Sequence, residues 1–204
     1  MDTTKYIDLL KTVLHFEIKN EKRFYIPAAN EMKFKTKLNN NSEMETPYIC
    51  SLLPLVLTNM INILHPELVQ KIVLYLTNSK QFDQLDSCIT KLNISCIDLD
   101  QIIKLSTKYH MFSSFIHIYN SAFNDFLTPI KKMVDFISDP KFTHCNRDIQ
   151  SEIVIKAIVY IHCCFSGKDF FTGDPLPSSI AESVKSNVRN YFAIYWNLYQ
   201  VFLY

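Results

Sequence analysis

The scarcity of glycine constrains this chain more than any other feature of its sequence. Only two of the 204 residues are glycines, Gly167 and Gly173. Tight β-hairpins and phosphate-cradling loops usually need several glycines, because their turns hold residues at positive φ. Helices joined by polar turns need few. The sequence therefore predicts an all-α fold and argues against an all-β fold or a nucleotide-binding α/β fold.

Composition predicts a globular chain with a large core. Hydrophobic residues make up 48% and aromatic residues 13% of the chain, and its formal net charge is +1. A near-neutral chain gives no field that would attract nucleic acid, and the short lysine runs at positions 33–37 and 131–132 are typical of solvated faces. The apolar runs at 48–64 and 191–204 fall short of the roughly 20 residues of a membrane span. We expect buried helices there, and no nucleic-acid partner.

Six cysteines are present without a CxxC pair, and charged residues interrupt the N-terminus where a signal peptide would be apolar. This pattern favours free thiols in a reduced, cytoplasmic compartment.

Residues 98–137 predict the organising element, an αα-hairpin followed by a third helix. Asp98 and Gln101 have the spacing of a capping box, and Thr128-Pro129 is typical of a helix start. Apolar residues recur at helical spacing on both arms of the hairpin. They are Ile102, Ile103, Leu105 and Tyr109 on the first arm, and Phe112, Phe115, Ile116, Ile118, Tyr119 and Phe123 on the second. We expect the two arms to lie antiparallel and share these faces.

The rest of the chain divides at residue 46. Residues 1–46 predict a helix over 4–20 and then a long polar loop, whose composition at 35–45 is typical of disorder. Residues 47–204 predict helices that begin at Pro47, Pro66 and Phe82, span 149–165, and run from a Ser179–Glu182 capping box to the end. The residues of the helix at 149–165 that we expect to face inward are Ile153, Ala157, Tyr160, Ile161 and Cys164. This second part is interpreted as a solenoid segment.

Two features support a solenoid that is incomplete at its C-terminal end. The string at 75–85 resembles the one at 105–115, thirty positions further along the chain. A repeat period near 30 residues is typical of stacked helix pairs. The final helix ends on apolar and aromatic residues, whereas end repeats normally carry a polar face. Phe192, Trp196 and Phe202 are therefore candidate partner-contact residues.

No motif for catalysis, cofactor binding or metal binding is evident. His162, Cys163 and Cys164 would point in different directions on a helix, so they cannot share one ion. Ser166-Gly167-Lys168 lacks the earlier glycine of a phosphate-binding loop and is interpreted as a helix stop. We predict no enzyme activity, no catalytic residue, no cofactor and no metal. A helical enzyme remains open if His117, His144 or His162 meets a carboxylate in a deep polar pocket.

Two stretches resemble a known family. The first, at 104–130, carries Lys108-Tyr109, then Ile118-Tyr119-Asn120, Asp125 and Thr128-Pro129. The second, at 167–177, is a Gly-basic-x-aromatic-x-Thr-Gly-Asp-x-x-Pro loop before a long helix, with Phe171 where the family usually has proline. In both, the chain resembles the central segment of the vacuolar protein sorting-associated protein 8 family, the CORVET-specific subunits of class C tethering complexes.

This resemblance implies an all-α solenoid of antiparallel helix pairs, of the clathrin-heavy-chain-like repeat type, in a complex that tethers endosomal membranes. It implies a structural and protein-interaction role in vesicle-mediated transport to the endosome and vacuole, with other class C subunits as partners. Localisation would be cytoplasmic and peripheral on endosomal membranes. Membrane and Rab GTPase association would be indirect, through a propeller and other parts that this sequence does not contain.

A second class of function stays open. The chain could be a stand-alone helical adaptor that binds a peptide or partner helix in an aromatic groove, since surplus aromatic surface on helices suits such binding.

Overall fold

The computed structural model describes Ile18–Lys19, Arg23–Phe24 and residues 45–203, with side-chain environments from Ile49 to Ile194. The first four residues form two short antiparallel strands, β1 (Ile18–Lys19) and β2 (Arg23–Phe24), in which Ile18 pairs with Phe24. The predicted helix over 4–20 therefore does not reach Ile18. Its other residues, and nearly all of the predicted polar loop, lie outside the described residues.

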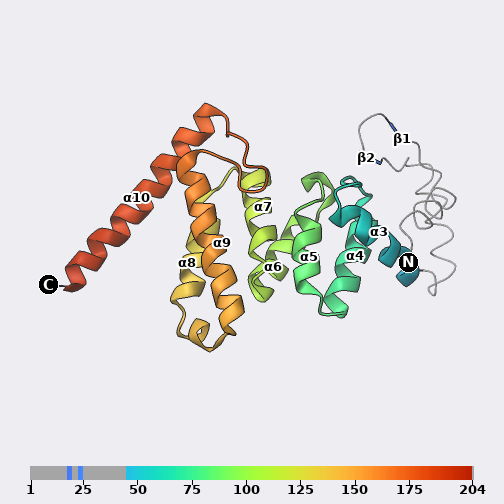
Figure 1. The fold of residues 1–204 in the computed structure, drawn as a ribbon, viewed down its shortest axis with the longest axis horizontal. Helices are drawn as coiled ribbons and strands as arrows, with labels where there is room; N and C mark the ends of the chain where they lie inside the picture. Colours follow the sequence, from blue (N-terminus) through green and yellow to red (C-terminus); the bar gives the residue numbers. More distant parts are fainter. Residues whose placement is uncertain (1–17, 20–22, 25–44, 204) are drawn as a thin grey trace. The chain divides into compact units, whose positions relative to one another are not determined.

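From residue 45 onward, the described regular elements are helical (Figure 1). They are α3 (Glu45–Leu57), α4 (Pro66–Asn78), α5 (Phe82–Ile89), η2 (Ile94–Cys96), α6 (Leu99–Tyr109), α7 (Phe112–Phe123), α8 (Leu127–Ser138), η3 (Pro140–His144), α9 (Arg147–Ser166) and α10 (Ser178–Leu203). The predicted all-α fold is confirmed. The chain divides into two compact units, Met1–Ile118 and Tyr119–Tyr204.

In the first unit, α3, α4 and α5 pack against one another around an aliphatic core. The helices start where the sequence predicts, because His65 caps α4 ahead of Pro66 and Asp98 Oδ1 accepts a hydrogen bond from Gln101 N at 3.1 Å. Side chains from α6 and α7 complete the core, with Ile102 and Ile118 almost fully buried. These two residues lie on the faces predicted to be apolar.

The two helices predicted for the hairpin both form, as α6 and α7, and they meet at His110, which takes a left-handed conformation with φ of 58°. Ile102 and Tyr109 of α6 belong to the same core as Ile118 of α7, so the apolar faces predicted on the two helices contribute to one core. Tyr109 also stacks on Phe82 at the start of α5, with ring centroids 3.8 Å apart.

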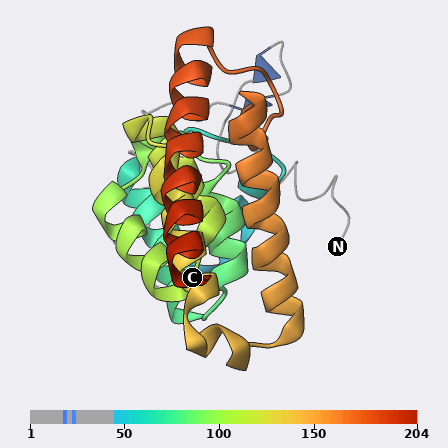
Figure 2. The ribbon, with the colours of Figure 1, turned by 90° about the vertical axis from the view of Figure 1, so that its left-hand side faces the viewer.

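The second unit is built on α9, which packs against both α8 and α10. Figure 2 shows α9 (orange) beside the first turns of α10 (red). The inward face of α9 carries Ile153, Ala157, Tyr160 and Cys164, all buried as the helical spacing predicts. Facing them, Ala181, Val184 and Val188 of α10 are also buried. Ile161, which was also expected to face inward, is only half-buried.

Two helix starts in this unit differ from the prediction. Helix α8 begins at Leu127, so Thr128 lies in its first turn and Asp125 supplies the cap. Helix α10 begins at Ser178, and Glu182 forms an ion pair with Lys185 at 3.1 Å. In both cases the polar contacts differ from those that the sequence pattern singled out.

Candidate interaction surface of the C-terminal unit

Asp125 organises the turn between α7 and α8. Its Oδ1 accepts hydrogen bonds from the backbone amides of Leu127 and Thr128, each at 3.0 Å, and the Thr128 hydroxyl donates to Oδ2 at 2.6 Å. Burial raises the pKa of the Asp125 carboxyl, but these hydrogen bonds and the charge of Lys131 outweigh burial, so the pKa is lowered. Asp125 is therefore an ionised helix cap at neutral pH.

Tyr160 of α9 joins this turn to the end of α7. Its hydroxyl donates to Asn120 Oδ1 at 2.7 Å and also lies 3.1 Å from the carbonyl oxygen of Phe126. The tyrosine is 1% exposed. Burial raises its pKa, so the hydroxyl stays protonated and keeps its role as donor. Two polar residues of the first family-like stretch, Asn120 and Asp125, are thus structural.

The loop between α9 and α10 is a compact, internally bonded turn. Asp169 Oδ1 accepts hydrogen bonds from the amides of Phe171 and Thr172, at 2.9 and 2.8 Å. Gly167 and Gly173 have φ of 65° and 74°, which ordinary side chains rarely adopt. The loop also brings the Phe170 ring against Tyr160, with centroids 5.4 Å apart and planes nearly perpendicular. Both family-like stretches therefore converge on one tyrosine.

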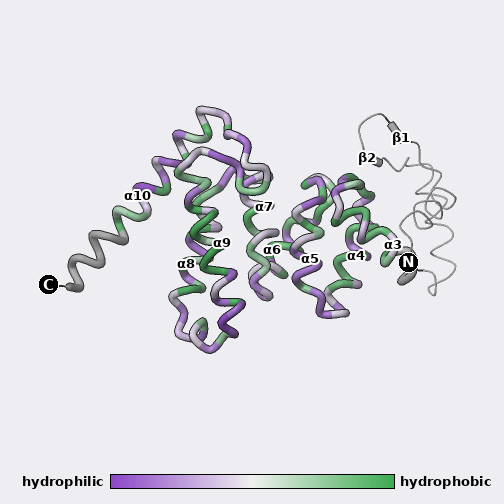
Figure 3. The backbone as a smooth tube through the Cα atoms, in the orientation of Figure 1, coloured by the Kyte–Doolittle hydropathy of each residue, from purple (hydrophilic) through white to green (hydrophobic). Residues whose placement is uncertain are grey.

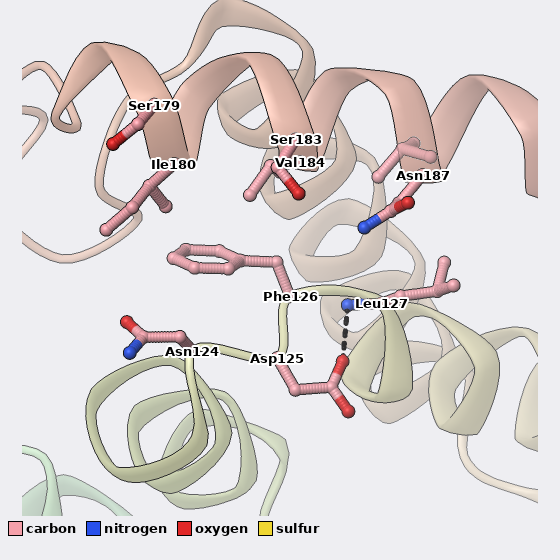
Figure 4. Close-up of a pocket in the computed structure, with 10 residues that line it drawn as sticks. Asn124, Asp125, Phe126, Leu127, Ser179, Ile180, Ser183, Val184 and Asn187 are labelled. Carbon is pink, nitrogen blue, oxygen red and sulfur yellow. Dashed lines mark hydrogen bonds between the residues drawn. The ribbon is translucent and has the colours of Figure 1, made fainter.

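A cavity of about 450 Å³ lies between the Asp125 turn and the first half of α10. Figure 4 shows Phe126 pointing toward Ile180, with Ser179, Ser183 and Asn187 along α10. Phe126 is the one aromatic residue among those that line it. The cavity is therefore no aromatic groove of the kind expected for a stand-alone adaptor.

The outer face of α9 carries large apolar side chains that face solvent. Ile155, Ile158, Val159 and Phe165 are all exposed, opposite the buried face of the same helix. Figure 3 shows the apolar character of α9 along much of its length. By length and composition, α9 is also the one helix of the described residues that could cross a membrane. Its inward face and the bonded Tyr160 indicate instead a helix packed within the unit.

The predicted partner-contact residues fall at the edge of what is described. Phe192 is half-buried, and its ring centroid lies 6.4 Å from that of Phe165. The side chains of Trp196 and Phe202 lie outside the described residues. The sequence analysis missed the exposed isoleucines of α9, although apolar residues on both faces of one helix were a signal that could have found them.

The three histidines considered as candidates for a helical enzyme do not come together in one site. His117 Nε2 contacts the carbonyl oxygen of Leu92 at 3.2 Å, while His144 and His162 are exposed, and none of the three lines the cavity. Within residues 45–194, no three His, Cys, Asp or Glu side chains gather as metal ligands would. The described cysteines are all free.

Comparison with known proteins identifies the family. The model described as Vps8 central TPR matches residues 47–195. The chain belongs to this family. Tetratricopeptide repeats are helix–turn–helix units that stack into solenoids, so the predicted solenoid class and the predicted family are both confirmed. The match to the Vps8 central TPR model leaves residues 1–46 outside.

Curated relatives agree with this family. The vacuolar protein sorting-associated protein 8 homologs of Homo sapiens and Mus musculus are 24% and 23% identical over 155 residues, which cover 74% of this chain. Vacuolar protein sorting-associated protein 8 of Saccharomyces cerevisiae is 31% identical over 74 residues, 36% of this chain. The chain spans 11% of the length of the human and mouse relatives and 6% of the yeast relative. No solved structure gives a significant match.

Proposed function

We propose that this chain is a helical scaffold segment of a CORVET-type endosomal tethering subunit. It acts in vesicle-mediated transport to the endosome and vacuole by holding recognition domains apart and by binding other class C subunits. The match of residues 47–195 to the Vps8 central TPR family carries this proposal. The names of the curated relatives, which place them in vacuolar protein sorting, also support this proposal.

The described structure suits a scaffold. The polar side chains that make short hydrogen bonds serve the fold: Asp125 caps α8, and Tyr160 joins α9 to α7. In this proposal the protein performs no catalysis, resides in the cytoplasm and associates peripherally with endosomal membranes. Membrane and Rab GTPase contacts are made through other parts of the assembly.

Co-purification of the tagged full chain from cytosol tests the proposal. Class C tethering subunits should be recovered in defined stoichiometry, and a fluorescent fusion should colocalise with an endosomal marker. Alkaline carbonate should release the membrane-associated fraction, as it does for peripheral proteins. Repeated absence of class C subunits from a folded, monodisperse preparation would contradict the tethering function.

A further inference from the structure

The cavity beside the Asp125 turn combines an apolar floor with a polar rim, and all of its lining residues belong to the second unit. Phe126, Val184 and Val188 are buried and form the floor. Four exposed polar side chains surround this floor. We call them the polar rim, and they are Asn124 on the turn before α8 and Ser179, Ser183 and Asn187 on α10 (Figure 4).

The fold does not use the polar rim. In the part of the chain that the structure describes, no hydrogen bond engages the side chain of any of its four residues. Nearby polar side chains differ, since Asn120 accepts from Tyr160 and Asp125 accepts from its own turn. Each rim serine offers one donor and an acceptor, and each rim asparagine offers two donors and a carbonyl acceptor. These groups are left for water or a ligand to satisfy.

The three rim residues of α10 have the spacing of an extended chain. Ser179, Ser183 and Asn187 follow one another at intervals of four residues, so they lie about 6 Å apart along the helix axis. Two residues of an extended peptide advance about 6.6 Å, and every second residue turns its main-chain N–H and C=O to the same side. Successive rim side chains therefore match alternate residues of such a peptide. Figure 4 shows Asn124 across the cavity from α10, where it faces the other edge of the peptide.

The chemistry of the lining argues against other occupants. The described residues that line the cavity include no lysine or arginine, so phosphate groups and nucleic acid would find no cation there. Asp125, the one ionisable residue of the lining, already accepts three hydrogen bonds within its own turn. A partner helix keeps its main-chain groups in its own hydrogen bonds, so it meets the rim only through side chains. An extended peptide has a neutral main chain with free donors and acceptors, which suits the rim.

We propose that this cavity binds an extended peptide segment of another protein, whose main chain contacts the polar rim and whose apolar side chain contacts Phe126. The main-chain groups of alternate residues bind Ser179, Ser183 and Asn187. Successive side chains of an extended chain point to opposite faces, so one of them points to the floor and its neighbours to solvent. The cavity volume of about 450 Å³ lies within the range of ligand pockets. This inference rests on the proposed scaffold function, because it names one site through which the scaffold holds a partner.

A displayed library of random linear peptides, selected against the full chain, supplies the probe. Selected peptides are labelled and titrated by fluorescence anisotropy against the parent, Ser183→Trp, which fills the cavity, and Ser186→Trp, an exposed position of α10 outside the described lining. Ser183→Trp should bind at least about tenfold more weakly, a loss of roughly 1.4 kcal/mol, and Ser186→Trp should bind as the parent does. Failure to select any peptide, or equal affinity of the three proteins, would overturn the proposal.

Main-chain recognition is tested on the peptide itself. In a series of variants, one N-methyl group at a time removes one main-chain donor. Affinity should fall roughly two- to tenfold at alternate residues, as expected for the loss of one hydrogen bond, and should change little at the residues between them. Equal losses at consecutive residues, or a helical conformation of the bound peptide by NMR, would overturn the extended geometry.

The rim is tested by a second pair of variants. Asn187→Leu keeps the approximate size of the side chain but removes its hydrogen bonds, so it should weaken binding of the selected peptide. Asn190→Leu, which is exposed on α10 and outside the described lining, should not. Equal affinity of the two variants would contradict the role of the rim. Circular dichroism should show unchanged helix content in all four variants, because each substituted residue is exposed.

Two outcomes separate this site from the scaffold function. Recovery of class C subunits from cytosol, without any peptide binding at the cavity, would refute the site and leave the scaffold function standing. Peptide binding that Ser183→Trp abolishes, without recovery of class C subunits, would do the reverse. The full chain should also elute as a monomer. A dimer that Ser183→Trp abolishes would show that a second copy of this chain occupies the cavity, and would overturn the proposal.

Discussion

The Tyr160 hydroxyl donates a hydrogen bond to Asn120 Oδ1 at 2.7 Å, between residues that are 40 positions apart in the chain. The same hydroxyl lies 3.1 Å from the Phe126 carbonyl oxygen. One buried donor thus ties α9 to the end of α7 and to the turn before α8. Since both acceptors are buried, they would lose their partner without gaining water if this hydroxyl were removed.

Tyr160→Phe should therefore lower the free energy of unfolding by about 1–3 kcal/mol. For a chain of this size, that corresponds to a fall in Tm of roughly 2–4 °C per kcal/mol. Urea denaturation followed by circular dichroism measures the change. Tyr109→Phe is the matched control, since Tyr109 contacts Phe82 by ring stacking. Equal effects of the two substitutions would show that the Tyr160 hydroxyl contributes nothing specific.

Asp125→Ala should destabilise the chain by about 0.5–2 kcal/mol, the usual cost of removing a helix cap. Because the pKa of Asp125 is lowered in the folded state, its contribution is complete above the unfolded pKa near 4. The contribution is lost as the pH falls through the lower, folded pKa. The difference between parent and variant should accordingly be constant from pH 6 to 8 and shrink below pH 4, as measured by urea denaturation across pH. A difference that grew on acidification would contradict this assignment.

The two glycines provide a matched pair for the loop after α9. A Cβ on Gly173 meets no atom within 4 Å, so Gly173→Ala should cost only its backbone strain, about 1–2 kcal/mol. A Cβ on Gly167 would lie 3.0 Å from Ala181 Cβ, so Gly167→Ala adds crowding between the loop and α10. In thermal unfolding, the Tm of Gly167→Ala should be lower than the Tm of Gly173→Ala. The reverse order would mean that α10 yields easily at Ala181.

Asp86 of α5 should prove to be a long-range helix cap. Its carboxylate accepts hydrogen bonds from the amides of Ser113 and Ser114 in the first turn of α7, at 3.2 and 2.6 Å. Asp86→Ala should cost about 1–2 kcal/mol by denaturant titration. Asp83→Ala, at the first turn of α5 itself, is the control and should cost only a few tenths of a kcal/mol through the helix dipole. A larger loss at Asp83 would contradict this role.

The buried thiols should resist alkylation in the folded chain. Burial raises the pKa of Cys88 to about 12 and that of Cys164 to about 12, so the reactive thiolate is scarce near neutral pH. Peptide mapping after treatment with iodoacetamide at pH 8 should find these two unmodified, and fully modified after unfolding in guanidinium. Modification of either before the more exposed Cys145 would show that the unit opens locally.

The sequence predicted most of the local structure, because helix signals are local. Proline at the first position, helical spacing of apolar residues and the Asp98 cap depend on neighbours within one turn. From residue 47 onward, each predicted start lies within a few residues of the observed helix. The inward face of α9 was predicted for the same reason. The motifs at 104–130 and 167–177 also sufficed to indicate the family.

Capping partners and exposed surfaces were decided by the tertiary structure alone. Thr128 resembles a cap by sequence, but it is Asp125 that accepts hydrogen bonds from two backbone amides at the start of α8. Asp86 of α5 caps α7, which follows it only after the intervening α6. Helical periodicity likewise predicted the buried face of α9, but not that the apolar side chains on its opposite side would stay exposed. Packing against α8 and α10 buried Tyr160 and left Ile158 exposed, because two neighbours can cover only one face of a helix.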